Sequence, residues 1–216
     1  MDTKMYRTSI KEEMFNVITH ALGIGLSIAG LGILVVSAIR FGDVWHIVSF
    51  SIYGVSLIFL YTASTIFHSL LKVRPKFYAN IVDHSAVYIL IAGTYTPFTL
   101  ITLRGSWGWT IFGIVWGLAI LGVTYKIFMN TKYRVLSTIV YLLMGWVIII
   151  AVKPLYDNLA SGGLWLLALG GLSYSIGVVF YTFRKIPWGH GIWHIFVLLG
   201  SVLHFFSVYL YLLPGN

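Results

Sequence analysis

The chain has 216 residues, of which 59% are hydrophobic and only 9% carry a charge. A soluble domain carries about a quarter charged residues, so this composition excludes one and predicts an integral membrane protein. The sequence contains no cysteine, which excludes disulfides and thiolate ligands and leaves nitrogen and oxygen atoms to hold any metal ion. The net charge of +8 could suggest a nucleic-acid partner, but the basic residues lie in short connections between apolar runs, so we expect no nucleic acid.

Seven apolar stretches are long enough to cross a membrane, for which a helix needs about 20 residues. In chain order, we expect the spans at residues 17–39, 44–71, 81–103, 107–128, 135–152, 164–183 and 191–213. The connections are too short to hold a soluble domain, so we predict an all-α fold. It is a polytopic seven-transmembrane-helix bundle that forms a single domain over residues 1–216. The first stretch is too long for a cleavable signal and lacks a small-residue cleavage site, so we expect it to remain as a membrane helix.

The basic residues predict the orientation of this bundle. All but three of the 14 Lys and Arg residues lie in the N-terminal tail or near the second, fourth and sixth connections, which share one side. The exceptions on the other side are Arg40, Arg104 and Lys153. Because cytoplasmic loops carry an excess of Lys and Arg, we expect the N-terminus in the cytoplasm and the C-terminus outside.

Two histidines, His190 and His194, stand four residues apart at the start of the seventh span. This spacing places both rings on one face of a helix, and ionisable side chains inside a span usually serve a function. His68 closes the second span at the same predicted end of the bundle. Three imidazoles with an open fourth position are typical of a catalytic zinc site, where zinc lowers the pKa of bound water to about 7.

A carboxylate beside such a metal can accept the proton of the water molecule, and Asp83 is placed to do so. It opens the third span at the same end, whereas the other acidic residues, among them Glu12 and Glu13, are expected in tails or connections. Ser64 lies four residues before His68 on the same helical face, so its hydroxyl could reach a substrate or a water molecule.

Each of these residues also has a purely structural interpretation. His190 and His194 could bond to backbone carbonyls, and His68 could interact with the dipole at the end of its helix. Ser64 could bond within its own helix, and Asp83 could stabilise the first turn of the third span. These interpretations remain open alongside the metal site.

Three polar residues, Glu13, Asn16 and His20, enter the first span from the same side. We expect them to form a network that locks the first helix or lies behind the metal ligands, because three ligands are already assigned. Two histidines are expected elsewhere. His46 lies on the other side. His204 lies ten residues beyond the second histidine of the pair, about 15 Å along the helix, and is expected to be a core or outer-leaflet residue with a hydrogen-bond partner.

These residues fall into motifs that resemble the hemolysin III family, within a superfamily that includes the progestin and adipoQ receptors and the alkaline ceramidases. The motifs are Glu13-x-x-Asn16-x-x-x-His20, Ser64-x-x-x-His68, Asp83-His84 followed by Ala92-Gly93-Thr94-Tyr95-Thr96-Pro97, and His190-x-x-x-His194. His84 is adjacent to Asp83 and is expected to face elsewhere. The resemblance implies a zinc ion (Zn²⁺) on the three histidines, with Asp83 and Ser64 beside the metal-bound water, in a multi-pass protein of the bacterial cell membrane.

Three functions compete at this point. The resemblance favours a membrane-embedded zinc hydrolase of a lipid amide, with a membrane lipid as substrate and Asp83 as general base. Ser64 would help to stabilise the oxyanion or to position the water molecule. A pore or cytolysin is the second, although polar residues gather at one end instead of lining a channel. The third is a receptor-like, non-catalytic regulator of membrane state with a structural zinc ion; hormone binding is in doubt because the receptors' long N-terminal domain is lacking. The oligomeric state stays open: Gly113-x-x-x-Gly117 could form a dimer face, although we favour close helix packing within the bundle.

Overall fold

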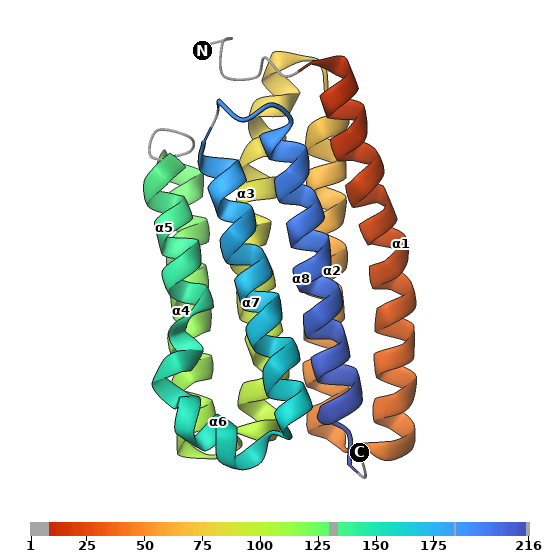
Figure 1. Ribbon diagram of the computed structural model, residues 1–216, viewed down its shortest axis with the longest axis vertical. Helices are drawn as coiled ribbons and strands as arrows, with labels where there is room; N and C mark the ends of the chain where they lie inside the picture. Colours follow the sequence, from red (N-terminus) through yellow and green to blue (C-terminus); the bar gives the residue numbers. More distant parts are fainter. Residues whose placement is uncertain (1–8, 130–133, 184, 215–216) are drawn as a thin grey trace.

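The structure is a computed structural model that describes residues 9–129, 134–183 and 185–214. Seven of its helices are long and apolar enough to cross a membrane, as predicted (Figure 1). We call the end of the bundle where α1 begins the N-terminal end, and the end where α8 stops the C-terminal end. Part of the orientation prediction lies outside the described residues, namely Lys4, Arg7, Lys132, Arg184 and the side chain of Arg134.

The helices follow one another around the bundle in chain order. They are α1 (Ile10–Phe41), α2 (Val44–Ser69), α3 (Val73–Pro97) with a π-helical turn (Phe98–Thr102), α4 (Ser106–Met129), α5 (Arg134–Gly145) with a 3-10 turn (Val147–Ala151), α6 (Val152–Asn158), α7 (Ser161–Thr182) and α8 (Gly189–Tyr211). Successive spans contact each other, and α8 closes the ring by packing on α1 (Figure 1). The ring brings the end of α2 beside the start of α8.

The first helix begins earlier than the sequence pattern predicts, at Ile10 instead of residue 17. Its N-cap is Ser9, whose hydroxyl accepts a hydrogen bond of 3.2 Å from the backbone N–H of Glu12. Glu12 and Glu13 therefore lie within the helix, and Glu13 is only 8% exposed. The prediction that both acids lie in a tail was wrong, because a window of apolar residues cannot find a helical turn whose polar side chains are buried against partners.

The third helix also begins early, at Val73 instead of residue 81. Its first turns contain Lys76 and Asn80, two buried polar side chains that hide the helix from a hydropathy reading. Asp83 therefore lies well inside α3 and not in its first turn. The interpretation of Asp83 as an acid that merely stabilises a helix start was wrong.

We predicted one continuous span over residues 135–152, but the fifth span is interrupted. The α-helix ends at Gly145, and a 3-10 turn leads into α6. The phenol of Tyr95 on α3 bridges the break, because its hydroxyl donates to the carbonyl of Gly145 (2.7 Å) and accepts from the N–H of Ile148 (2.8 Å). This side chain satisfies backbone groups that a broken helix leaves without intrahelical partners.

Two glycines of α4 differ in position from our expectation. A Cβ atom added at Gly113 or Gly117 would meet nothing within 4 Å, so this pair faces outward. The interpretation of the pair as a packing surface inside the bundle was wrong. Gly122 is the close-packing glycine of this helix, since a Cβ there would collide with the ring of Tyr88 on α3.

Candidate metal centre

Three histidines meet at the N-terminal end of the bundle. His68 lies in the last turn of α2, and His190 and His194 lie in the first turns of α8. The Nε2 atom of His190 is 3.1 Å from Nε2 of His68 and 3.1 Å from Nε2 of His194. One ligand atom from each residue falls within 4.8 Å of the others, so the three side chains lie close enough to hold a metal ion.

The geometry and chemistry of this cluster fit a tetrahedral ion such as zinc. Zinc–nitrogen bonds of about 2.0–2.1 Å place two ligand atoms of a tetrahedron about 3.3 Å apart, close to the Nε2 separations seen here. His68 is 4% exposed and His194 is 1% exposed, so water does not satisfy their nitrogens. His68 and His194 are buried and His190 is partly buried, and a cation shared by the three side chains would bind one nitrogen of each.

The outward-facing nitrogen of His68 has a carboxylate partner. Its Nδ1 donates to Oε2 of Glu13 across 2.6 Å, which leaves Nε2 as the atom with the free lone pair. Glu13 uses its other oxygen, Oε1, to accept a bond of 2.8 Å from Nζ of Lys76. The side chains of α1, α2 and α3 are thereby joined behind the cluster.

The first helix contributes further residues beside the cluster. Nδ2 of Asn16 lies 3.4 Å from Nδ1 of His68, and the hydroxyl of Thr19 lies 3.5 Å from Nδ1 of His194. The ring of His20 stacks on that of His194, with centroids 3.6 Å apart and planes 13° apart. Neither nitrogen of His20 has a hydrogen-bond partner in the described part of the chain. The structure thus places Glu13, Asn16 and His20 beside the cluster. We expected them to lie behind the ligands.

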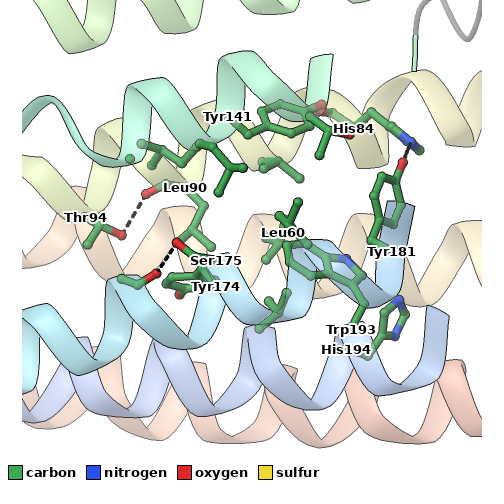
Figure 2. Close-up of a pocket in the computed structure, with 18 of the residues that line it drawn as sticks. Leu60, His84, Leu90, Thr94, Tyr141, Tyr174, Ser175, Tyr181, Trp193 and His194 are labelled. Atoms are coloured by element: carbon green, nitrogen blue, oxygen red, sulfur yellow. Dashed lines mark hydrogen bonds between the residues drawn. The ribbon is translucent and has the colours of Figure 1, made fainter. Parts of the chain in front are cut away.

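A cavity of about 130 Å³ lies beside the histidines and contains the remaining predicted site residues. Ser64, Asp83 and His20 line it together with His190 and His194. The rest of its wall is largely apolar or aromatic and includes Val87, Ile91 and Val197. Leu60, Leu90 and Trp193 belong to the same wall (Figure 2). The structure therefore groups a hydroxyl, a carboxylate and imidazoles at one end of an apolar space.

A second, larger cavity continues toward the C-terminal end. Its volume is about 390 Å³, and it shares Thr94, Tyr95, Trp146 and His204 with the first cavity. The interrupted fifth span forms part of its wall through Ile148, Ile149 and Val152. Because the two cavities share wall residues, they lie next to each other in the bundle.

One residue of the cavity wall was misplaced by sequence reasoning. We expected His84 to face away from Asp83. Instead, Nδ1 of His84 lies 3.4 Å from Oδ2 of Asp83 and 3.0 Å from the carbonyl oxygen of Asn80. The other ring nitrogen is 3.0 Å from the hydroxyl of Tyr181 (Figure 2). Adjacent residues can line the same cavity on α3 because this is the most buried of the seven spans. Tyr181, on α7, was missed because nothing in its local sequence sets it apart from other interfacial tyrosines.

Two histidines lie outside the histidine cluster, as predicted, although His204 lines both cavities. Nε2 of His204 donates to the carbonyl of Leu167 over 3.0 Å, which confirms the expected hydrogen-bond partner. His46 contacts Oδ1 of Asp43 through Nδ1 (2.8 Å) and the carbonyl of Leu212 through Nε2 (2.9 Å). The hydrogen bond from His46 lowers the pKa of the Asp43 carboxyl below its ordinary value.

The fold and the cluster together define a multi-pass membrane protein with three histidines close enough to hold a metal ion between its second and last spans. The model of a family described as "Haemolysin-III related" matches residues 8–205. The chain is 52% identical to the "Hemolysin-3 homolog" of Bacillus subtilis (strain 168) over 203 residues, which are 94% of this chain and 95% of that relative. It is 49% identical to "Hemolysin-3" of Bacillus cereus over 216 residues, 99% of each chain.

A human protein is similar over nearly the same length. The "Monocyte to macrophage differentiation factor" of Homo sapiens is 31% identical over 215 residues, which are 96% of this chain and 87% of that relative. The chain therefore belongs to the hemolysin III family, and the resemblance seen in its sequence motifs is confirmed.

Proposed function

We propose that this protein is a metal-dependent hydrolase of a lipid amide, with zinc held by His68, His190 and His194. The observation that carries the proposal is the convergence of three Nε2 atoms beside a cavity that also holds a carboxylate. Zinc in such a site would polarise a carbonyl group and make a water molecule acidic enough to react near neutral pH.

The carboxylate of Asp83 would act as the general base. It lies in the wall of the same cavity as His190 and His194, within an apolar span where a carboxylate is costly unless it is used. The imidazole of His84, 3.4 Å away, would hold Asp83 in place. A proton removed from the attacking water would pass to Asp83 and then to the departing amine.

The hydroxyl of Ser64 would assist at the carbonyl oxygen. Ser64 is buried one helical turn before His68 and lines the cavity with Asp83. A hydroxyl in this position would donate a hydrogen bond to the oxygen on which negative charge develops, where such donors act strongly because water is excluded.

A lipid substrate is supported by the surroundings of the site. The cavity beside the histidines is largely apolar and borders a second apolar cavity, so a hydrocarbon chain would be accommodated better than a polar molecule. The amide bond is proposed from the resemblance to the alkaline ceramidases. With the N-terminus in the cytoplasm, as the basic residues predict, the site would lie near the cytoplasmic leaflet.

The test is hydrolysis of a fluorescent N-acyl sphingoid amide by purified protein in lipid nanodiscs, with zinc content measured on the same sample. We expect Asp83→Asn to retain zinc but to lose about 10²–10⁴-fold in turnover, the usual contribution of a general base. Asp157→Asn is the matched control, because this exposed acid pairs with Lys153 at the far end. A folded wild type without zinc, or equal turnover in Asp83→Asn, would contradict the proposal.

A structural metal in a non-catalytic regulator is the second candidate. It is supported by the way in which the cluster and its partners join α1, α2, α3 and α8. In that case removal of the metal would lower thermal stability, while Asp83→Asn would leave the cellular phenotype unchanged. The cytolysis suggested by the name of the Bacillus cereus relative has less support, because both cavities described here have mainly apolar walls, unlike an ion pathway.

A further inference from the structure

We propose that Glu13 and Lys76 form a positioning pair that sets the metal affinity of the cluster by fixing the tautomer and orientation of His68. This inference rests on the proposed metal site and assigns a role to two residues that are not themselves ligands. Both residues come from turns that sequence reasoning places outside the spans.

The contacts run in one line from Lys76 to the cluster. Nζ of Lys76 lies 2.8 Å from Oε1 of Glu13, and Oε2 of Glu13 lies 2.6 Å from Nδ1 of His68. The opposite nitrogen of His68, Nε2, is the atom that approaches His190 at 3.1 Å. All three side chains of the line are buried, so water does not compete for these hydrogen bonds.

The hydrogen bond to Glu13 determines what His68 can offer to a cation. A neutral imidazole carries one proton, and a carboxylate that accepts from Nδ1 holds the proton on that atom. Nε2 is then left with its lone pair directed at the cluster. Partners of this kind also make the ligand more basic, and their loss typically costs about 10–100-fold in metal affinity.

Lys76 keeps the carboxylate of Glu13 in this position. An isolated carboxylate is costly to bury, and a cation in direct contact offsets much of that cost. The ammonium group also lies 5.0 Å from the ring centroid of Phe67, which itself contacts the ring of His68 edge-on at 4.7 Å. Lys76 is thus held from two sides, and Glu13 cannot turn away from His68 without losing its cation.

A merely structural interpretation is that the pair only ties α1 to α3. The two interpretations differ in what happens when both charges are removed together. Removing one member of the pair takes the opposite charge away from the other buried side chain and destabilises the fold in either case. Removing both charges relieves that penalty but still leaves His68 without its carboxylate.

The experiment measures zinc affinity by competition with a chelator, and thermal unfolding, for four detergent-purified proteins. They are the wild type, Glu13→Gln, Lys76→Met and the double variant Glu13→Gln/Lys76→Met. We expect both single variants to unfold at lower temperature and the double variant to regain much of that loss. Zinc affinity should fall about 10–100-fold in Glu13→Gln and in the double variant alike, and much less in Lys76→Met. Glu12→Gln, on the neighbouring and more exposed acid, should change neither quantity.

Two results would overturn the inference. One is a double variant that regains both the stability and the zinc affinity of the wild type, which would mean that the pair only links α1 to α3. The other is unchanged zinc affinity in Glu13→Gln. Failure of the proposed function itself looks different, because the folded wild type would then bind no zinc, or would bind zinc without hydrolysing the amide.

Discussion

The two ends of the bundle contain the same kinds of side chain but arrange them differently. At the C-terminal end, His46 directs its two nitrogens at Oδ1 of Asp43 and the carbonyl of Leu212. At the N-terminal end, the Nε2 atoms of His68, His190 and His194 point at one another. The first arrangement is satisfied by oxygen atoms, whereas the second presents nitrogen lone pairs to a shared point.

The difference teaches that the orientation of the ring, and not the presence of a histidine in a span, marks the candidate site. A histidine whose nitrogens meet oxygen atoms stabilises the fold through ordinary hydrogen bonds. A group of histidines from different helices whose Nε2 atoms converge is explained by a cation that binds all of them. Substitutions matched between the two ends can break or sharpen this comparison.

The largest effect is expected from the loss of a cluster histidine. Loss of a hydrogen-bond partner of a ligand costs up to about 100-fold in metal affinity. His194→Ala should lower zinc affinity by more than this, because it removes a ligand itself. His204→Ala, ten residues further along the same helix, should leave zinc content unchanged. Elemental analysis of both purified variants measures this. Equal zinc loss in the two variants would remove the distinction between the ends.

A smaller effect is expected at the other end. His46→Ala removes the bond to the carbonyl of Leu212 and the contact with Asp43 at a buried position, which should cost about 1–3 kcal/mol in the free energy of unfolding. Its zinc content should equal that of the wild type. Denaturation in mixed micelles, followed by tryptophan fluorescence, gives the stability. A loss of zinc without a loss of stability would reverse our assignment of the two ends.

The smallest effect concerns Asp43, whose exposed carboxyl has a lowered pKa because of the bond from His46. A folded pKa below the unfolded one adds stability that is complete above the unfolded pKa and disappears as pH falls through the folded pKa. Asn caps helices about as well as Asp, so Asp43→Asn removes mainly the charge.

The unfolding temperature of Asp43→Asn should therefore be slightly below that of the wild type at pH 7. The gap should begin to close as the pH falls below about 4, the ordinary pKa of an aspartate, and should vanish below the lowered pKa of the folded carboxyl. Thermal unfolding of both proteins across this pH range measures the gap. A gap that stays constant with pH would show that the charge of Asp43 does not contribute.

Much of the fold follows from hydropathy alone, because a lipid environment demands long apolar helices and little else. The seven spans were predictable for this reason, and the helix-turn spacing of His190 and His194 gave the direction of their rings. Adding His68 required only the alternation of spans, which places the end of the second beside the start of the seventh. The depth shared by these three residues is a consequence of topology.

The remaining features depend on tertiary contacts that no local pattern records. Glu13 and Lys76 look like charges of a tail and a connection, because the partners that allow their burial come from other helices. His84 shares a cavity with Asp83 because neighbouring helices surround α3, which the sequence of α3 does not reveal. The break in the fifth span begins at Gly145, but it also depends on a tyrosine from another helix, which the sequence of the span does not reveal.

That tyrosine has a consequence for biogenesis. The backbone of the fifth span has groups at Gly145 and Ile148 that bond to the hydroxyl of Tyr95, on a helix synthesised earlier. A ribosome delivers α3 to the membrane before α5, so the acceptor and donor are already waiting when the later segment leaves the translocon. If α5 entered the membrane before α3, its backbone groups at Gly145 and Ile148 would lack hydrogen-bond partners in the lipid. The order of translation avoids this intermediate.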